Sequence, residues 1–389
     1  MYLFENNSIN LTTLRERAYN LRWATVPQGV IPLTAADPDF PCAPQIIESI
    51  KQYAQEGYFN YGPPEGLPCF KESVADFFIR KRNVPVLSSN VLPTDSAAFG
   101  IYITCKTFLN KGDDAIIFDP VDFLFRYSIE AVGANAIPFQ IAPGCKEIDF
   151  DLFERLITPK TKMFCLCNPL NPTGKVFTKA ELEKFGELAC KYNLIILSDE
   201  IWSDIVFAPS VFTSIASISE EIRNRTVTIS GFSKSYGLAG LRIGFIVAHQ
   251  QTIYSKLFDT SLHQSTIHGA NVVSQIAATT ALTSCDEWLE NFLTHLEEMK
   301  NLCVKELNSM HQFKCIAPEG CYVAFVNITE TNKSSLQIQE LFMNKAKVAV
   351  VPGLPKWFGD GAEGYFRISF ATSKEILSEA FNRMRNSSI

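Results

Sequence analysis

The sequence predicts an α/β fold in which a mostly parallel central sheet is flanked by helices and followed by a smaller α+β domain. Two observations carry this prediction. Between about residues 95 and 250, short apolar runs alternate with helical patterns, as in strands joined by crossover helices. The chain also has 389 residues, more than the roughly 250–300 at which a single hydrophobic core stops growing, so a second domain is expected.

The predicted strands of the central sheet are five apolar runs. They are AIIF (115–118), KMFCLC (162–167), LIILS (194–198), TVTIS (226–230) and GFIVA (244–248). We expect all five to be parallel. Between the second and third, residues 179–192 have the apolar spacing of a helix, and Thr178 with Glu181 three positions later forms a capping-box pattern that starts it.

A long helical pattern over about 271–310 leads into the expected second domain. Its strands are predicted at 322–328, 348–352 and 366–371. The first 45 residues are irregular, and we expect them to pack on the large domain and the substrate site. The predicted division is therefore an N-terminal segment 1–45, a large cofactor-binding domain 46–283 and a small C-terminal domain 284–389. The glycine- and proline-rich stretch 352–364 is read either as a loop that covers a ligand or as an ordinary surface loop.

Composition excludes several classes of protein. The net charge is −6 and no lysine or arginine block occurs, so nucleic acid is not an expected partner. No apolar run approaches the ~18 residues of a membrane span, and the N-terminus lacks a leader pattern, so we expect a cytoplasmic protein that binds no membrane. The eleven cysteines include no CxxC pair. We interpret most of them, including Cys165 and Cys167 on one predicted strand, as buried thiols, and expect no metal.

Polar residues that directly follow the predicted strands are the candidate site, because ligands of such sheets lie beyond the carboxyl ends of the strands. Asn168–Gly174, Asp199 and Ser230–Lys234 qualify. Lys234 stands among small residues, where desolvation would lower its pKa and free the amine to form a Schiff base with a carbonyl compound. A solvated surface charge is the alternative. Arg242, eight positions later, could contact a phosphate through its planar fork.

The segment SGFSKSYGLAGLRIG (230–244) resembles the cofactor-lysine signature of class I/II aminotransferases, in the fold-type I pyridoxal phosphate family. Further matches follow in the family's order from Asp37 to Arg367, so the resemblance covers most of the chain. It implies the fold-type I transferase fold, pyridoxal 5'-phosphate as cofactor, and a Schiff base between the cofactor and Lys234, which then acts as general base and acid.

Three further motifs carry roles by the same resemblance. In CNPLNPTGKVF (167–177), Asn171 would bond the phenolic oxygen of the cofactor and lie beside the substrate. In LSDEIW (197–202), Asp199 would pair with the protonated pyridine nitrogen, which lets the ring accept an electron pair. In GYFRISFA (364–371), Arg367 would form a bidentate pair with the substrate's α-carboxylate. Ala36, in the N-terminal segment, would also contact the substrate.

The remaining contacts implied by the resemblance involve the phosphate and a second subunit. PTDSAAFGIYI (93–103) would hold the phosphate at a helix N-terminus. Tyr61, in YFNYGPPEGLPCF (58–70), would reach the phosphate of the neighbouring subunit, which implies a homodimer with shared active sites. The full set of expected cofactor contacts is Ser96, Ala97, Ala98, Asn171, Asp199, Trp202, Ser233, Lys234, Arg242 and Tyr61.

The sequence departs from the family's pattern at three positions. Asp122 stands where many relatives place an aromatic ring that stacks on the cofactor, with Phe123 and Phe125 as candidates to replace it. Trp202 stands where many have a tyrosine, and its indole N–H can donate but not accept. Gly231 replaces a common serine. None of these changes affects Lys234, Asp199 or Arg367.

The resemblance implies an aminotransferase of amino acid metabolism, which moves an amino group between an α-amino acid and a 2-oxo acid. The main alternative is a carbon–sulfur lyase, because ADPDF in LTAADPDFPCAP (33–44) resembles the start of cystathionine β-lyase-like enzymes. A ligand-sensing regulator and an inactive homologue are further alternatives, which the acidic chain and the retained site residues disfavour. Arg22, Arg126 and Lys356 are available for an acidic substrate but cannot be placed.

Overall fold

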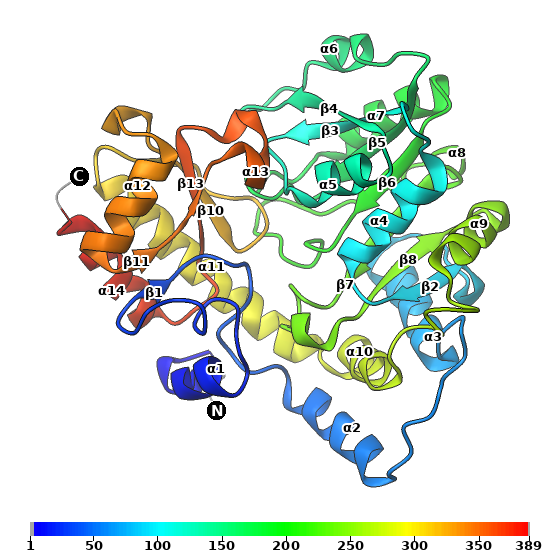
Figure 1. The fold of residues 1–389 in the computed structure, drawn as a ribbon, viewed down its shortest axis with the longest axis horizontal. Coiled ribbons are helices and arrows are strands. Elements are labelled where there is room, and N and C mark those ends of the chain that lie inside the picture. The colour runs from blue at the N-terminus through cyan, green and yellow to red at the C-terminus, as the bar shows by residue number, and fades with distance from the viewer. Residues whose placement is uncertain (1–3, 388–389) are drawn as a thin grey trace.

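The computed structural model describes residues 4–387 and contains a seven-stranded central sheet (Figure 1). Its strands are β2 (Val91–Thr94), β3 (Asp114–Asp119), β4 (Asn135–Gln140), β5 (Thr161–Cys167), β6 (Ile195–Asp199), β7 (Thr226–Gly231) and β8 (Gly244–Ala248). They lie in the order β2-β8-β7-β6-β5-β3-β4, and every neighbouring pair from β7 to β4 is parallel. The predicted α/β fold with a mostly parallel sheet is confirmed.

The direction of β8 differs from the prediction. It runs antiparallel to both β7 and β2, with Ser230 opposite Phe245. A parallel strand needs a crossover connection, usually a helix, and residues 232–243 hold only the short turn Ala239–Leu241. The chain instead returns directly along the sheet, through the segment that contains Lys234.

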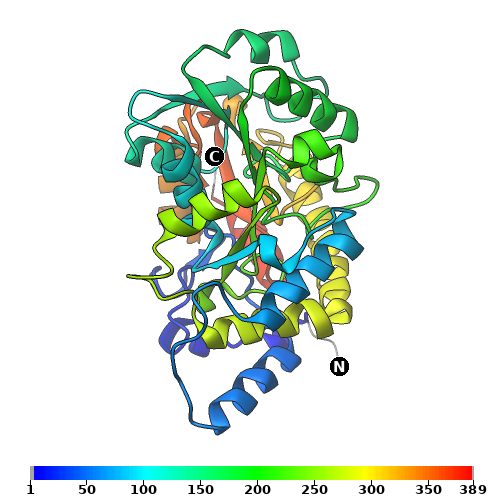
Figure 2. The same cartoon turned by 90° about the vertical axis from the view of Figure 1, so that its right-hand side faces the viewer.

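Helices cover the central sheet. They are α4 (Ala97–Phe108), α5 (Leu124–Ala131), α6 (Phe150–Arg155), α7 (Lys179–Lys191), α8 (Glu220–Arg223) and α9 (Gln251–Ser261), with α2 (Pro44–Gln55) and α3 (Pro68–Phe77) earlier in the chain. The capping box of α7 is confirmed. Thr178 Oγ1 accepts from the Glu181 amide at 3.2 Å, and Glu181 Oε2 accepts from the Thr178 amide at 2.7 Å. In both views α2 lies at the edge of the molecule (Figures 1 and 2).

The long helical pattern predicted over 271–310 forms two helices. α10 (Val272–Ser284) and α11 (Asp286–Ser309) are separated at Cys285, whose backbone leaves the helical region at φ −121° and ψ 20°. α11 has 24 residues, about 36 Å at 1.5 Å per residue. It runs from the neighbourhood of α10 to the C-terminal part of the chain (Figure 1).

A second sheet lies in the C-terminal part. Its order is β12 (Val351–Pro352), β13 (Tyr365–Ser369), β10 (Val323–Asn327) and β9 (Lys314–Cys315), and neighbours are antiparallel. The helices here are α12 (Ser335–Leu341), α13 (Pro355–Phe358) and α14 (Lys374–Arg385). The run predicted as one strand at 348–352 is divided, because β11 (Val348–Ala349) pairs with β1 (Ile31–Pro32) rather than joining the second sheet.

The N-terminal segment therefore has contacts with the C-terminal part of the chain. After the short helix α1 (Leu11–Glu16), β1 pairs with β11, Leu33 O accepts from the Ser369 amide at 2.9 Å, and the Asp39 amide donates to Ala371 O at 3.1 Å. These bonds fix the path of residues 31–39 beside β13. The predicted domain limits near 45 and 283 stay predictions.

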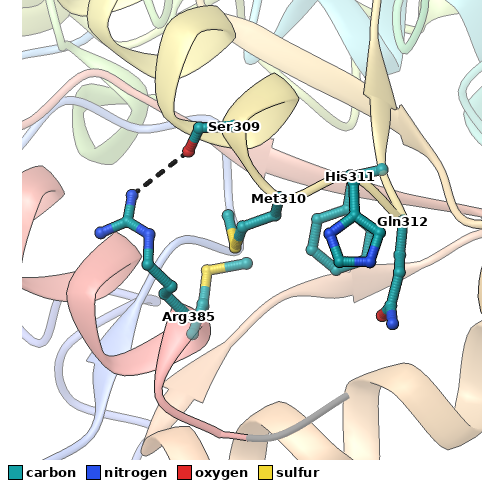
Figure 3. Close-up of a pocket in the computed structure, with 7 residues that line it drawn as sticks. Ser309, Met310, His311, Gln312 and Arg385 are labelled. Carbon is teal, nitrogen blue, oxygen red and sulfur yellow. Dashed lines mark hydrogen bonds between the residues drawn. The ribbon is translucent and has the colours of Figure 1, made fainter.

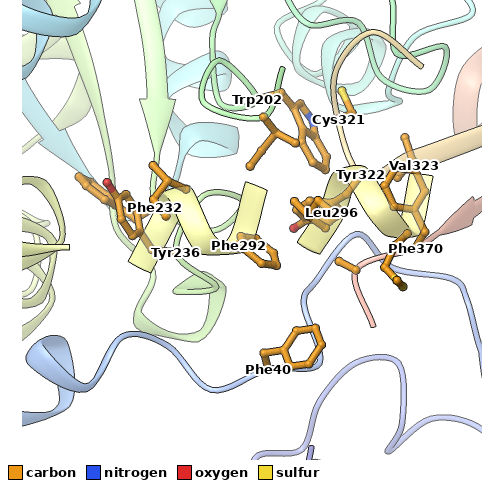
Figure 4. Close-up of a cluster of buried hydrophobic side chains, with 14 of the residues drawn as sticks. Phe40, Trp202, Phe232, Tyr236, Phe292, Leu296, Cys321, Tyr322, Val323 and Phe370 are labelled. Carbon is orange, nitrogen blue, oxygen red and sulfur yellow. The ribbon is translucent and has the colours of Figure 1, made fainter. Parts of the chain in front are cut away.

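A continuous hydrophobic core joins the two sheets. Figure 4 shows Phe292 and Leu296 of α11 among aromatic side chains from distant segments. Trp202 follows β6, Tyr322 precedes β10, and their rings meet edge-on at 4.7 Å. Other members of this core are Phe40, Phe232, Tyr236 and Phe370. The opposite face of the central sheet has its own core, centred on Phe118, Phe164 and Phe185.

Other structural findings bear on function. Within residues 4–387, no helix is long and apolar enough to span a membrane, and no group of three metal-ligating side chains is assembled. All eleven cysteines are free thiols, and seven of them, including Cys165 and Cys167, are buried. The interpretation of most cysteines as buried thiols is confirmed.

Candidate active site

The polar residues predicted at the strand ends lie at one edge of the central sheet. Asp199 is the last residue of β6 and pairs with Cys167, the last residue of β5. Asn171 follows β5 and Lys234 follows β7. Because β5, β6 and β7 are parallel neighbours, their carboxyl ends bring these three side chains to the same region. Arg367 of β13 and Ala36 of the N-terminal segment, which runs beside β13, also lie in this region.

Lys234 is partly buried and points into this region. Its Nζ donates to the Ala36 carbonyl at 2.7 Å and lies 5.2 Å from the centre of the Trp202 ring. Tyr322 Oη donates to the same carbonyl at 3.1 Å. Burial lowers the pKa of the Lys234 amine, against the opposing effect of the Asp37 and Asp122 carboxylates. These contacts exclude the alternative of a solvated surface lysine, and a lowered pKa favours the nucleophilic neutral amine.

Asp199 is a buried carboxylate, 8% exposed. Its Oδ1 accepts from the Ile201 amide at 3.0 Å, and in the described part of the chain it has no ion pair. Burial raises the pKa of Asp199 to about 7, and Asp122 adds to the shift while Lys234 opposes it. A buried carboxylate without a cationic partner is suited to a ligand that brings a protonated ring nitrogen, which would hold the carboxylate in its charged form.

The N-terminus of α4 lies next to the strand that follows Lys234. Ser96 caps the helix, with Oγ accepting from the Phe99 amide at 3.1 Å. A side chain at Gly244 of β8 would place its Cβ 2.5 Å from the Ala97 nitrogen, so only glycine permits this close approach. The first-turn amides at Ala97 and Ala98 have no partner within the helix, as at any helix start, and this twelve-residue helix adds its dipole. The arrangement fits an anion such as a phosphate.

Two predicted cofactor contacts, Arg242 and Ser233, have no observed side-chain partner among residues 4–387. Arg242 is exposed, and in residues 4–387 no hydrogen bond or ion pair engages its guanidinium. Ser233 is partly buried next to Lys234. Ser230, which stands one position before the glycine that replaces the family's serine, donates its hydroxyl to Glu200 O at 3.3 Å. That hydroxyl is therefore used within the protein.

Arg367 is 8% exposed and is held by neutral groups. Its Nη1 donates to Asn171 Oδ1 at 3.0 Å, and Nη2 donates to the Thr34 carbonyl at 3.3 Å. The Phe358 ring centre lies 5.1 Å from the guanidinium carbon. Nε is buried and has no partner among residues 4–387. A buried guanidinium with an unpaired donor and no direct carboxylate bond is suited to bind a carboxylate ligand.

Asp122 joins this group through Asn171. Its Oδ2 accepts from Asn171 Nδ2 at 2.8 Å, so the amide bridges Asp122 and Arg367. Of the two candidates to replace the stacking ring, Phe125 is buried in the core of the opposite face and cannot face a cofactor. Phe123 contacts the Trp357 ring edge-on at 5.5 Å.

Several residues of this region were not anticipated. Thr34 contributes a backbone carbonyl, and Tyr322 and Phe358 contribute rings and a hydroxyl. Ala36 was expected near the substrate, but not that its carbonyl accepts from Lys234 Nζ. The stretch 352–364 forms α13 and a turn rather than a plain loop. It is docked on the end of β3, because the Gly361 amide donates to Asp119 Oδ1 at 3.0 Å and the Val121 amide donates to Phe358 O at 2.9 Å. In the sequence, only the glycine and proline content of this stretch indicated that it could lie over a ligand.

The cations considered for an acidic substrate are now placed. Arg22 is fully buried and donates to the carbonyls of Pro32 and Asp37 while pairing with Asp39, so it is not available to a substrate. Arg126 pairs with Glu130 at 3.7 Å. Arg126 and Lys356 line one small hollow with Asp122 and Phe358.

Tyr61 lies on the surface. It is 87% exposed, and its ring centre is 5.1 Å from that of His268. Tyr58 and Phe59 are also exposed, and residues 59–62 and 267–273 line a shallow hollow. Within one chain, Tyr61 therefore does not contribute to the site.

Another hollow, at the end of α11, is unrelated to this region. Figure 3 shows Met310, His311, Gln312 and Arg385 around it, and the Arg385 guanidinium donates to Ser309 Oγ at 3.3 Å. None of the predicted site residues lines it. The active-site candidate remains the edge of the central sheet.

Comparison with known proteins identifies the class. The profile of the family "Aminotransferase class I and II" matches residues 28–384. An aspartate aminotransferase of Pyrococcus horikoshii is 34% identical, covering 92% of this chain and 90% of its own. Aromatic-amino-acid aminotransferase 2 of Thermococcus litoralis is 32% identical, covering 92% and 91%. The structure of a candidate aminotransferase from Clostridium difficile 630 with pyridoxal phosphate bound superimposes with a TM-score of 0.90, at 28% identity and 99% coverage of both chains.

The chain therefore belongs to the class I and II aminotransferases. It is a pyridoxal phosphate-dependent transaminase with the fold-type I architecture, and its substrates are an amino acid and a 2-oxo acid. The relatives do not favour the carbon–sulfur lyase alternative.

Proposed function

We propose that the residues at the edge of the central sheet divide into a cofactor group and a carboxylate group. In the cofactor group, Lys234 carries pyridoxal phosphate covalently through Nζ, and Asp199 faces the ring nitrogen. In the carboxylate group, Arg367 binds the α-carboxylate of the amino acid. The observation that carries this proposal is the meeting of Lys234, Asp199 and Arg367 from three distant segments, each buried or partly buried without an opposite charge bonded to it.

When bound, the cofactor supplies an electron sink for the bond broken at the substrate's α-carbon. Asp199 keeps a negative charge beside the ring nitrogen. Lys234 Nζ would take the proton from the substrate's α-carbon and return one during transfer. Arg367 and Asn171 fix the orientation of the substrate, and the edge-on rings of Trp202 and Tyr322 exclude water beside Nζ.

The phosphate site is proposed at the start of α4, with Ser96, Ala97 and Ala98 supplying backbone amides, and with Ser233 and Arg242 beside it. Asn171 and Trp202 are proposed to face the phenolic oxygen, and Ala36 to face the substrate. Each assignment rests on the match to the family's motifs and on the placements described above.

A homodimer is proposed on the same basis. Tyr61 is 87% exposed, and its sequence neighbours Tyr58 and Phe59 are also exposed. An exposed aromatic patch of this kind is typical of an association surface. In the proposed dimer Tyr61 completes the phosphate site of the second subunit, and the enzyme acts in the cytoplasm.

The test follows the absorption spectrum of the purified enzyme with aspartate, phenylalanine and tyrosine as donors and 2-oxoglutarate as acceptor. A donor should shift the cofactor band, and the acceptor should restore it. Lys234→Ala should lose at least about 10³-fold in turnover, because both proton transfer and covalent attachment disappear. The exposed lysine variant Lys256→Ala is the matched control and should keep wild-type turnover.

Two results would contradict the proposal. Full turnover in Lys234→Ala would exclude its assigned role. Release of pyruvate and ammonia from cystathionine without an acceptor, with no transfer to 2-oxoglutarate, would replace transamination by elimination.

A further inference from the structure

Asp122 occupies one of the three positions at which the sequence departs from its family's pattern, and it makes two hydrogen bonds to Asn171. Its amide donates to the Asn171 carbonyl at 3.1 Å, and its Oδ2 accepts from Asn171 Nδ2 at 2.8 Å. Its other oxygen, Oδ1, accepts from the Leu124 amide at 3.2 Å, in a turn that fixes the side chain at the start of α5. Asp122 and Asn171 therefore form a rigid link between the segments that follow β3 and β5.

The partners of Asn171 determine which way its amide points. Nδ2 faces a carboxylate, which only accepts, and Oδ1 faces the Arg367 guanidinium, which only donates. A flipped amide would place two acceptors together at Asp122 and two donors together at Arg367. Both contacts favour the same orientation, and Nδ2 keeps its second hydrogen free for another acceptor.

Arg367 depends on this link because its remaining partner is weak. Apart from Asn171, its guanidinium donates to the Thr34 carbonyl at 3.3 Å, and Nε is buried without a partner among the described residues. The chain of bonds Asp122–Asn171–Arg367 thus connects the central sheet to β13 across the substrate region.

We propose that Asp122 is a positioning residue that holds the Asn171 amide and, through it, the Arg367 guanidinium in place for the substrate's α-carboxylate. This inference rests on the proposed role of Arg367. A tryptophan ring at position 122 could not perform this function, because it has no acceptor for Asn171 Nδ2.

The charge of Asp122 has a separate effect from its hydrogen bond. Arg367, Lys234 and Asp199 act on it electrostatically, and Arg126 and Lys356 line the same small hollow. Burial raises the pKa of Asp122, and Arg367 is the strongest opposing influence. An anion at this place competes with an incoming carboxylate for Arg367. Removal of the acceptor should weaken substrate binding, whereas removal of the charge alone should not.

The experiment separates these effects with Asp122→Ala and Asp122→Asn in the holoenzyme. Asparagine can keep an acceptor for Asn171 Nδ2 while it loses the charge, and it gives up the bond from the Leu124 amide, because its NH2 group cannot accept. The probe is 2-methylalanine, which has the α-amine and α-carboxylate but no α-hydrogen, and its dissociation constant is read from the change in the cofactor band. KM and kcat are measured in parallel with the donor that the wild type uses.

We expect Asp122→Ala to raise the dissociation constant of 2-methylalanine and the KM of the donor about tenfold or more, as for the loss of a hydrogen bond to a charged group. Turnover should fall less than KM rises. Asp122→Asn should stay within about threefold of the wild type or bind more tightly. The control is Asp114→Ala, at the start of β3, the strand that precedes Asp122. It removes a carboxylate that accepts from Asn135 Nδ2 at 2.8 Å. It should leave both constants unchanged.

The inference would be overturned if Asp122→Ala had the same dissociation constant for 2-methylalanine and the same KM as the wild type. It would also be overturned if Asp122→Asn bound 2-methylalanine as weakly as Asp122→Ala. If Asp122→Ala does not fold, Asp122→Asn decides alone, and a tenfold weakening in that folded variant is again contrary. A wild type that transfers no amino group would instead contradict the proposed function.

Discussion

The cofactor group and the carboxylate group of the site differ in how their polar atoms are satisfied. Asp199 accepts a single hydrogen bond from the Ile201 amide, and Lys234 is bonded to one backbone carbonyl. Arg367 and Asn171 are instead joined with Asp122 in a continuous chain of bonds. The cofactor side has few hydrogen-bond partners within the protein, and a tightly bound group can supply the missing ones. The carboxylate side is already ordered and needs only to exchange partners as substrates come and go.

The strongest test of this contrast is the removal of the charge at Asp199. Asp199→Asn should reduce turnover about 10²–10³-fold, the size found when one preorganised electrostatic contact is removed from an active site. Asp199→Glu keeps the charge and should retain more activity than the asparagine variant. Steady-state turnover with cofactor in excess is the measurement. Wild-type turnover in Asp199→Asn would show that the cofactor side does not depend on this carboxylate.

The next effect concerns the carboxylate side. Arg367→Lys retains a positive charge but loses the planar fork, so KM for the amino donor should rise about 10–100-fold while turnover falls less. Arg383→Lys on the surface of α14, where Arg383 pairs with Glu379 at 2.7 Å, is the matched control. A fall in turnover at constant KM would assign Arg367 to the chemical step instead.

A smaller effect is expected in the pH dependence of stability. The pKa of Asp199 is raised from 3.8 to about 7 by burial, so the folded chain binds this proton more tightly than the unfolded chain. Proton binding by Asp199 therefore stabilises the folded chain fully below about pH 4. This contribution to the free energy of unfolding is lost as the pH rises to about 7, at about 1.4 kcal/mol per pH unit.

Denaturant unfolding of the cofactor-free protein between pH 4 and 7 tests this slope. Glu200 has a pKa raised to about 7 as well, so the informative quantity is the difference between the wild type and Asp199→Asn. As the pH rises from 4 to 7, the wild type should lose stability relative to Asp199→Asn, so the two curves of unfolding free energy against pH should not run parallel. Parallel curves would mean that Asp199 has an ordinary pKa in the folded chain.

The smallest expected effect lies outside both groups. Tyr61→Phe removes one hydroxyl from the exposed patch and should weaken cofactor binding about threefold to tenfold, as for one neutral hydrogen bond, if the partner subunit uses it. Tyr58→Phe is the control in the same patch, where Tyr58 is 71% exposed. Equilibrium dialysis and sedimentation of the same samples give affinity and subunit number. A monomeric wild type would remove the basis for the Tyr61 assignment.

Local signals in the sequence predicted much of this molecule. The capping box at Thr178 was correct because it depends only on residues within one turn. The apolar runs located five strands of the central sheet, and the rule that ligands lie at the carboxyl ends of parallel strands brought Asn171, Asp199 and Lys234 together. These features depend on periodicity and strand order, which the sequence displays directly.

What could not be predicted depends on contacts between distant segments. The direction of β8 follows from a connection without a helix, and the division of 348–352 follows from the pairing of β1 with β11. The bridge from Asp122 to Arg367 joins side chains 245 positions apart through Asn171. No local pattern marks such a bridge, and the family resemblance expected an aromatic ring at that place.

The carbonyl of Ala36 accepts hydrogen bonds from both Lys234 Nζ and Tyr322 Oη, and it belongs to the backbone. No substitution at position 36 can delete this atom. A substitution at position 36 therefore retains the hydrogen bond between the N-terminal segment and Lys234, provided that β1 and the bonds at Leu33 and Asp39 preserve the path of the chain. Over evolution, side chains in this segment can change to suit new substrates while the atom that holds the lysine remains.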